Sequence, residues 1–133
     1  MSVSNSAKNQ IEYVNIDAIH LNPKNPRLHS KAQIQQIAKS IKRFGWNIPI
    51  AADRNGMILA GNGRYDAAKL LGLKEIPIVR LNHLTKAQAK AYIVADNKLT
   101  ENSQWNEQLL GEIFLELSKS DLDFELSDTG FEV

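Results

Sequence analysis

The sequence predicts an α+β fold in which helices surround a small mixed β-sheet. Short runs rich in β-branched and aromatic residues alternate with segments whose apolar residues recur every three or four positions. Asparagine, proline and glycine separate these segments. With 133 residues, the chain can build one domain around one modest core. We expect this domain at residues 11–118, after a disordered tail at 1–10 and before an acidic linker at 119–133 that leads to a further C-terminal domain.

A strand, a loop and a helix are predicted at the start of the domain. Residues 11–16 read IEYVNI, a composition typical of a strand. Residues 21–30 read LNPKNPRLHS, which favours a loop because each proline fixes φ and removes a backbone donor. Ser30 caps the following helix and Gly45 ends it. The apolar residues of this helix recur at i+3 and i+4 and are Ile34, Ile37, Ala38, Ile41 and Phe44.

The centre of the chain reads as a hairpin followed by a short helix. IPIAAD at 48–53 is a strand, and the Arg-Asn-Gly turn at 54–56 leads back into MILA at 57–60. Asn-Gly supplies the positive φ that a tight hairpin needs. We expect the helix to begin at residue 64 or 65 and to end before Gly72.

One more strand and two more helices complete the prediction. EIPIVRL at 75–81 is the strand, and Thr85 caps a helix with a face of small residues that ends at about 96–99. A further amphipathic helix is expected at 105–117. Its inward residues are predicted to be Leu109, Leu110, Ile113, Phe114 and Leu117.

Composition excludes several classes of protein. Hydrophobic residues make up 43% of the chain and charged residues 23%, which is ordinary for a globular domain. No apolar run approaches the 18 or so residues of a membrane span, so we expect no membrane partner. The chain has no cysteine, which excludes disulfides, thiolate metal sites and a cysteine nucleophile. A cytoplasmic location fits these features.

The charges are unevenly distributed although the formal net charge is only +1. Residues 18–52 contain six lysines and arginines and no acid, whereas residues 101–133 contain nine acids and one lysine. This asymmetry suggests a half that faces a polyanion such as DNA, although such a charge pattern more often reflects two simply solvated faces. The residues expected to face DNA are Lys24, Lys31, Lys39, Lys42 and Arg43.

The stretch Gly61-Asn62-Gly63-Arg64 lies between a predicted strand and a predicted helix. Glycine lets the backbone approach an anion, and the free N–H groups at a helix start favour phosphate. The Arg64 guanidinium matches two phosphate oxygens. The spacing fits neither the dinucleotide fingerprint nor the Walker loop, and the local pattern leaves an ordinary strand-to-helix turn as an equal alternative.

Two other segments carry candidate binding residues. Arg27 and His29 lie on the proline-rich loop and could complete an anion site, although a lone histidine is more often an ordinary surface group. Asp96 and Asn97 offer oxygen ligands that suit Mg²⁺ with a bound nucleotide. On its own, this pair is more typical of a polar helix end. His20 and His83 have no partner at metal-ligand spacing.

Taken together, the segments resemble the ParB-like N-terminal domain of the ParB/sulfiredoxin superfamily over about residues 11–104. LNPKNPR is similar to the first box of the family, which ends in Pro-Arg. QIAKSIKRFGWNIPI is similar to its helix and Gly-x-x-x-Pro-Ile motif, LAGNGRYDAAKLLG to its Gly-Glu-Arg-Arg box, and ADNKL to its Glu-Asn stretch. The order and spacing of the four parts make the resemblance specific.

The resemblance implies a ParB/sulfiredoxin-like fold with a nucleotide site that binds CTP or ATP with Mg²⁺. The residues that it assigns to the nucleotide are Gly61, Asn62, Gly63, Arg64, Arg27, Gly45, Asn47, Ile48, Pro49 and Asn97. The Gly-Arg box and Arg27 would contact phosphates, Gly45, Asn47, Ile48 and Pro49 the base, and Asp96 the metal. In the full-length protein such a domain would regulate an attached DNA-acting domain and could form a homodimer.

Departures from the family pattern bear on catalysis. Asn62 replaces the glutamate of the partition proteins and Gly63 their first arginine, which puts nucleotide hydrolysis in doubt. Asn62 also stands where the sulfiredoxin branch has its catalytic cysteine, so sulfinic-acid repair is excluded. The Gly-x-Gly-Arg form resembles ParB-like domains fused to DNA methyltransferases of phages and mobile elements. A weak NTPase activity and a direct nuclease or DNA-binding role stay open as alternatives.

Overall fold

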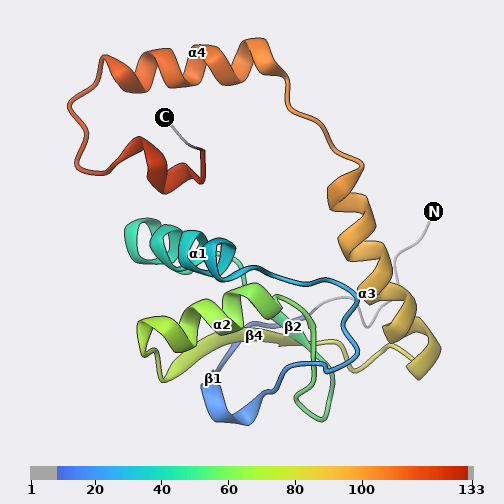
Figure 1. Cartoon of the computed structure of the whole chain (residues 1–133). Coiled ribbons are helices and arrows are strands. Elements are labelled where there is room, and N and C mark those ends of the chain that lie inside the picture. Colours follow the sequence, from blue (N-terminus) through green and yellow to red (C-terminus); the bar gives the residue numbers. More distant parts are fainter. Residues whose placement is uncertain (1–8, 132–133) are drawn as a thin grey trace.

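The computed structural model describes residues 9–131 and contains one mixed four-stranded sheet (Figure 1). The strand order is β1 (Glu12–Asn15), β4 (Glu75–Arg80), β2 (Ile50–Ala52) and β3 (Ile58–Ala60). The outer pairs β1–β4 and β2–β3 are antiparallel, whereas the central pair β2–β4 is parallel. The predicted α+β class with a small mixed sheet is therefore confirmed. Most of the tail expected at 1–10 lies outside the described residues.

Four α-helices accompany the sheet within residues 9–131: α1 (Lys31–Phe44), α2 (Asn62–Leu71), α3 (Lys86–Glu101) and α4 (Glu107–Ser118). Helix α2 packs on the sheet, and α1 packs on α2 (Figure 1). The core between them is aliphatic, and four isoleucines in it have no exposed surface: Ile50, Ile58, Ile76 and Ile78. This arrangement places the end of α1 and the start of α2 side by side.

The predicted helix caps at Ser30, Gly45 and Thr85 are confirmed. The Ser30 hydroxyl accepts a 3.1 Å hydrogen bond from the Gln33 N–H at the start of α1. Gly45 follows α1 with a φ of 87°, which favours glycine. Thr85 and Gln88 form a reciprocal capping box at the start of α3. Local side-chain chemistry thus sets these helix ends, as the sequence predicts.

Two helix boundaries differ from the prediction. Helix α2 begins at Asn62 rather than at residue 64 or 65, because Gly61 has a φ of 109° and turns the chain directly from β3 into the helix. Helix α3 continues to Glu101, past its predicted end. The Asn97 side chain donates to the Ile93 carbonyl at 2.9 Å, and the Thr100 hydroxyl donates to the Asp96 carbonyl at 3.0 Å. These polar residues therefore bond within the helix instead of ending it.

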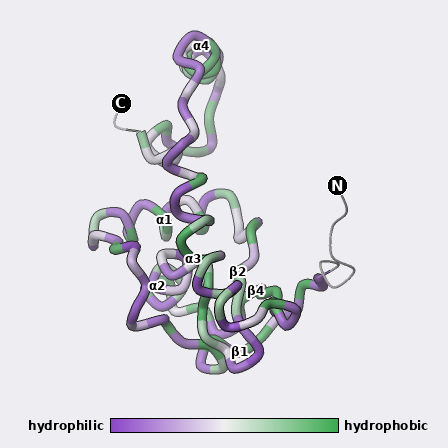
Figure 2. Tube along the Cα trace, turned by 90° about the vertical axis from the view of Figure 1, so that its right-hand side faces the viewer, coloured by the Kyte–Doolittle hydropathy of each residue, from purple (hydrophilic) through white to green (hydrophobic). Residues whose placement is uncertain are grey.

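Helix α4 stands apart from the sheet and from α1 and α2, as two perpendicular views show (Figures 1 and 2). It begins at Glu107 rather than Trp105, because the Asn106 side chain caps it by accepting from the Leu109 N–H at 3.1 Å. The prediction of a fully inward apolar face is wrong, since Leu109 and Ile113 are each 54% exposed.

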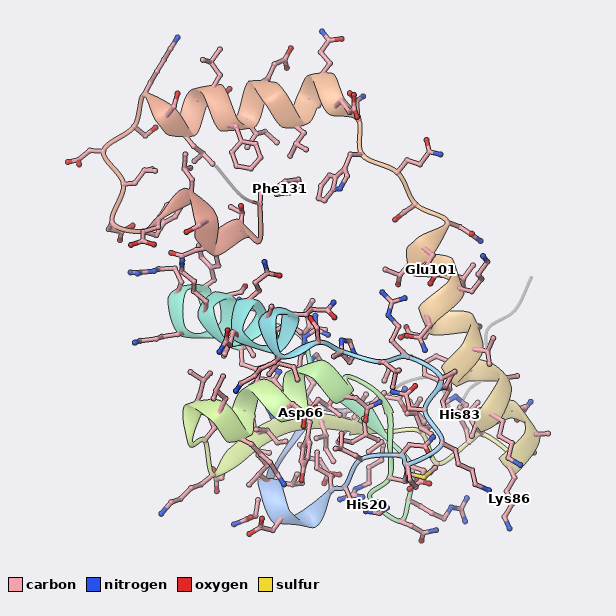
Figure 3. The ribbon with its side chains drawn as sticks, in the orientation of Figure 1. His20, Asp66, His83, Lys86, Glu101 and Phe131 are labelled. Atoms are coloured by element: carbon pink, nitrogen blue, oxygen red, sulfur yellow. The ribbon has the colours of Figure 1, made fainter. Side chains whose placement is uncertain are left out.

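An aromatic residue at the end of the described chain packs against α4. Phe131 lies beside the helix (Figure 3), with ring centroids 5.4 Å from Phe114 and 5.2 Å from Trp105. Phe131 therefore joins α4 to the residues that return to α1.

Residues 121–131, which we call the acidic segment, lie in the stretch predicted as a linker. They contain a 3₁₀ helix, Leu126–Thr129, that contacts α1. Asp128 is buried there, with its carboxylate 2.9 Å from Arg43 Nε and 3.4 Å from Lys39 Nζ. The segment thus has a fixed place on the domain, and a further domain beyond it remains an expectation.

The contacts of Asp128 predict how stability responds to acid. Burial alone raises the pKa of this carboxyl, but the Glu125 N–H and the charges of Arg43 and Lys39 outweigh burial and lower the pKa below its ordinary value of 3.8. A lowered folded-state pKa stabilises the protein above the unfolded pKa, and this stabilisation is lost as pH falls through the folded pKa. Asp128→Asn should therefore lower Tm at pH 7 and have a smaller effect on Tm at pH 2.

Thermal melts at the two pH values check this prediction. Asp121→Asn is the matched control, because Asp121 is an exposed acid of the same segment. An equal loss of Tm at both pH values for Asp128→Asn would show that the charge of the carboxylate does not matter.

Candidate functional site

A pocket of ≈ 380 Å³ lies where the end of α1, the start of α2 and the C-terminal half of α3 meet. Ten of the eleven residues predicted to hold nucleotide or metal line it: Arg27, Gly45, Asn47, Ile48, Gly61, Asn62, Gly63, Arg64, Asp96 and Asn97. Pro49 is half-buried and is not a lining residue. Four segments far apart in the sequence thus contribute to one site.

The start of α2 forms one wall of the pocket. Gly61 precedes the helix without a side-chain cap, so the first N–H groups of α2 have no partner within the helix. A Cβ at residue 61 would lie 2.9 Å from Ile50 Cγ1, so glycine also fits the close approach to β2. Backbone donors at a helix start, together with the helix dipole, favour a bound anion.

Asn62 adds an unpartnered polar atom to this wall. The residue is only 7% exposed, and its Oδ1 is buried without a hydrogen-bond partner among the described residues. A buried polar atom left without a partner costs roughly 1–3 kcal/mol. The cost is removed when a donor from a ligand or a water reaches the oxygen, so the side chain suits a binding site.

Two arginines bring positive charge to the pocket. Arg64 is half-buried on the first turn of α2, and none of the ion pairs within residues 9–131 involves it. Arg27 Nη1 lies 3.0 Å from Glu101 Oε1, a carboxylate near the end of α3 (Figure 3). A phosphate bound here would have Arg64 available, whereas it would share Arg27 with Glu101.

His29 is at the pocket wall, although the sequence favours an ordinary surface role for it. Its Nδ1 lies 3.0 Å from Gln33 Oε1, which fixes the ring. A Cβ at residue 63 would lie 3.2 Å from His29 Cε1 and 2.8 Å from Ile37 Cδ1. Gly63 therefore lets the imidazole and α1 approach the start of α2. The only signal for this in the sequence is the nearness of His29 to Arg27 in the proline-rich loop.

The opposite wall contains the turn after α1. Trp46 Nε1 donates to the Ile48 carbonyl at 2.6 Å, and the Asn47 side chain donates to the carbonyls of Phe44 and Gly45 at 2.9 and 3.2 Å. These bonds hold an apolar and amide surface that suits a nucleobase. Sequence reasoning missed Phe44 and Trp46 as lining residues, although both are direct neighbours of the predicted Gly45.

The donor set for a metal is small. Asp96, Asn97 and Thr100 line the pocket from α3. No group of three or more histidines and acids within the described residues could hold a metal alone. Mg²⁺ commonly uses one or two carboxylates together with substrate phosphates, so these residues fit Mg²⁺ only alongside a nucleotide. His20 and His83 lie in separate loops outside the pocket (Figure 3).

The residues predicted to face DNA divide into two groups. Lys24, Lys31 and Lys42 are exposed. Lys39 and Arg43 instead form ion pairs with the acidic segment. The basic stretch is therefore partly covered by acids from the C-terminal end of the chain. No described helix is long and apolar enough to span a membrane.

The comparison with known families fits this fold and pocket. The family described as the ParB N-terminal domain matches residues 1–98. The chain belongs to this family. The ParB-like nuclease domain-containing protein YnaK of Escherichia coli K12 is 39% identical over 83 residues, which are 62% of this chain and 95% of YnaK. A probable chromosome-partitioning protein ParB of Rickettsia typhi is 33% identical over 92 residues, which are 68% of this chain and 32% of that protein.

Solved structures agree on the ParB/sulfiredoxin-like fold. A truncated ParB of Caulobacter crescentus, complexed with CTP-γ-S, aligns with a TM-score of 0.69 and 22% identity over 84% of this chain and 66% of that chain. Sulfiredoxin of Arabidopsis thaliana aligns with a TM-score of 0.52 and 21% identity over 63% of this chain and 97% of its own. The match to the partitioning protein of Rickettsia typhi covers only about a third of that relative.

Proposed function

We propose that this ParB N-terminal domain binds a nucleoside triphosphate, CTP or ATP, in the pocket between α1, α2 and α3. The observation that carries the proposal is the start of α2, where uncapped backbone donors, buried Asn62 and Arg64 face one pocket. Phosphates would lie against this helix start with Arg64 and Arg27, and the base against residues 45–48. The ParB of Caulobacter crescentus crystallised with CTP-γ-S supports the choice of ligand.

A magnesium ion would be held by Asp96 and the nucleotide phosphates. Bound there, Mg²⁺ would neutralise phosphate charge. The chain's own contribution is to position the nucleotide. The α2 N–H groups would orient the phosphates. Asn97 Nδ2 bonds to the Ile93 carbonyl, which leaves Asn97 Oδ1 available to the ligand. With Asn62 in place of a carboxylate, the pocket is better suited to holding a nucleotide than to hydrolysing it. The domain would then regulate an attached DNA-acting domain, such as a methyltransferase.

Isothermal titration of the protein with CTP, ATP, GTP and ADP, each with and without Mg²⁺, tests the proposal. We expect at least one triphosphate to bind at micromolar to low millimolar concentration, and more tightly with Mg²⁺ than with EDTA. Absence of heat with all four nucleotides at several millimolar would refute it.

The alternative function is cleavage of DNA by the domain itself. The name of the E. coli relative, a ParB-like nuclease domain protein, is the observation in its favour. The lack of a cluster of three acids or histidines within residues 9–131 counts against two-metal chemistry. Incubation of supercoiled plasmid with Mg²⁺ or Mn²⁺ decides the matter, and nicked or linear product would favour the nuclease.

The contact of His29 with the start of α2 yields a prediction for binding. An imidazole held at Nδ1 by Gln33 would donate from Nε2 to a phosphate oxygen. His29→Ala should weaken triphosphate binding by about tenfold, the effect of losing one hydrogen bond to a charged group. Titration of CTP and ATP measures the loss, and His20→Ala is the control because His20 is exposed and outside the pocket. Equal losses in both variants would remove His29 from the site.

A further inference from the structure

The face of α1 that carries Lys39 and Arg43 differs from the rest of the basic stretch. The two residues are one helical turn apart and therefore project on the same side of the helix. Ile37 and Ile41, which line the nucleotide pocket, lie on a different side. We call the Lys39 and Arg43 side the cationic face. It is separate from the pocket, and the proposed nucleotide does not account for it.

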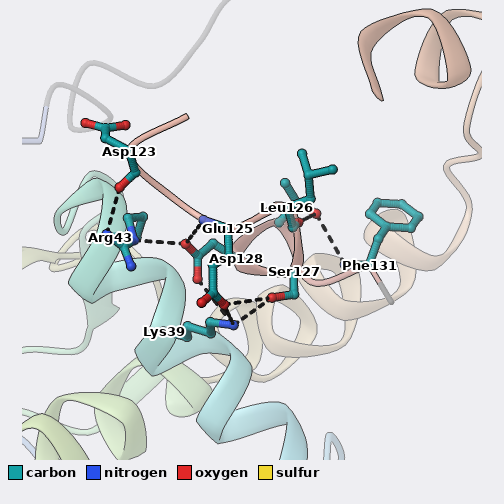
Figure 4. Close-up of polar contacts among 9 residues, drawn as sticks. Lys39, Arg43, Asp123, Glu125, Leu126, Ser127, Asp128 and Phe131 are labelled. Carbon is teal, nitrogen blue, oxygen red and sulfur yellow. Dashed lines mark hydrogen bonds and ion pairs between the residues drawn. The ribbon is translucent and has the colours of Figure 1, made fainter. Parts of the chain in front are cut away.

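The acidic segment occupies this face with several contacts (Figure 4). Lys39 Nζ donates to Ser127 Oγ at 2.7 Å and to Glu125 Oε2 at 3.1 Å. Arg43 donates from Nε to Asp128 Oδ2 at 2.9 Å and from Nη1 to the Asp123 carbonyl at 3.1 Å. Both cations are thus engaged by acceptors from one short segment.

The segment is shaped to present its acids to the cationic face. The Glu125 N–H donates to Asp128 Oδ2 at 3.0 Å, which fixes the carboxylate within the 3₁₀ helix. The Asp128 side chain is 0% exposed, whereas those of Lys39 and Arg43 remain 42% and 43% exposed. Phe124 adds an edge-to-face contact with Phe44 at 5.6 Å. The acid is enclosed, whereas both cations keep part of their surface open to solvent.

We propose that the cationic face binds the phosphate backbone of DNA, and that the acidic segment is an internal competitor for it. The phosphates of a DNA strand are closely spaced anions that can contact two cations one helical turn apart. Exposed Lys42 enlarges this cationic surface. The exposed Lys39–Glu125 pair is weak and screened by salt, so phosphate can compete with it, whereas the enclosed Asp128 carboxylate must leave the face before Arg43 binds DNA. DNA binding in turn gains from counterion release. DNA contact and docking of the acidic segment are therefore mutually exclusive.

The test compares DNA binding by charge-matched variants of the whole chain. Glu125→Gln/Asp128→Asn removes two acids from the cationic face, and Glu112→Gln/Glu116→Gln removes two exposed acids from α4. Fluorescence anisotropy with a labelled duplex at a series of salt concentrations measures affinity. The first variant should bind about tenfold more tightly than the second at low salt, with a salt slope steeper by about two for two added phosphate contacts.

A third variant shows whether any gain in DNA affinity comes from the cationic face. Adding Lys39→Gln/Arg43→Gln to Glu125→Gln/Asp128→Asn should return the affinity to that of the original chain. Equal affinity of the two charge-matched variants overturns the proposal, and so does a gain that survives loss of both cations. Should Glu125→Gln/Asp128→Asn fail to fold, Glu125→Gln alone serves, because this side chain is 70% exposed. Glu125→Gln should then bind DNA more tightly than Glu112→Gln, by a smaller factor than that between the two double variants.

Discussion

Arg64→Ala should weaken binding of CTP or ATP by about 10- to 150-fold. Arg64 is half-buried on the first turn of α2, where its guanidinium and the helix N–H groups would contact the same phosphate. A hydrogen bond to a charged group contributes about 1.5–3 kcal/mol, and each 1.4 kcal/mol is a factor of ten in affinity. Because none of the ion pairs within residues 9–131 involves Arg64, the variant should lose binding without losing much stability.

Two further variants make this prediction specific. Lys42→Ala removes the same charge from an exposed position on α1 that does not line the pocket, and should change the affinity less than twofold. Arg64→Lys keeps the charge but loses the planar fork, so it should fall between wild type and Arg64→Ala. Titration calorimetry and a thermal melt of each variant provide the readouts. If Arg64→Ala and Lys42→Ala bind equally well, phosphate is not held at the start of α2.

The sheet and the first three helices were within reach of sequence reasoning because their signals are local. Ser30, Gly45 and Thr85 set helix ends through bonds to residues three or four positions away, and these bonds are present. The hairpin turn at 54–56 likewise follows from Asn-Gly. Helix α4 was harder, because its periodic leucines predict an amphipathic helix but not what covers it. Among the described residues, Phe131 is the only one from outside 105–117 whose ring packs against the aromatic rings of this region.

Predicting the pocket needed two kinds of information. Its phosphate wall follows from Gly61-Asn62-Gly63-Arg64, whereas grouping this wall with residues 45–48 and with α3 depended on the family resemblance. The sequence raised His29 as a candidate for an anion site but could not decide between that and a surface role, because its place in the wall depends on a contact across Gly63 that only the packing of α1 on α2 creates.

The docked structure of the acidic segment could not be predicted from its composition. Its acids and turn residues predict a solvated linker, and no local pattern reveals that Asp128 lies between Lys39 and Arg43, 85 residues from the latter. The charge asymmetry pointed to two halves of opposite sign but not to their contact. Part of the surface predicted to face DNA is consequently covered by the chain itself.

Gly61→Ala should lower the free energy of unfolding by about 2–4 kcal/mol, because backbone strain and a packing clash act together. With a φ of 109°, residue 61 has a backbone conformation that alanine rarely adopts. The new Cβ would lie 2.9 Å from Ile50 Cγ1 and 3.4 Å from Ile50 Cα, and Ile50 has no exposed surface into which to move. Urea unfolding measures the loss, which corresponds to a fall in Tm of about 10 °C for a domain of this size.

Gly72→Ala at the other end of α2 separates strain from the clash. Gly72 also has a positive φ, 71°, but a Cβ there would meet no atom within 4 Å, so this variant should lose only about 1 kcal/mol. Equal losses at the two positions would mean that Ile50 yields and that strain alone sets the cost at residue 61. The two variants should also differ in binding, because residue 61 sets the direction of the α2 N–H groups that face the pocket. Gly61→Ala should therefore lose triphosphate affinity even where it is fully folded, whereas Gly72→Ala should keep it.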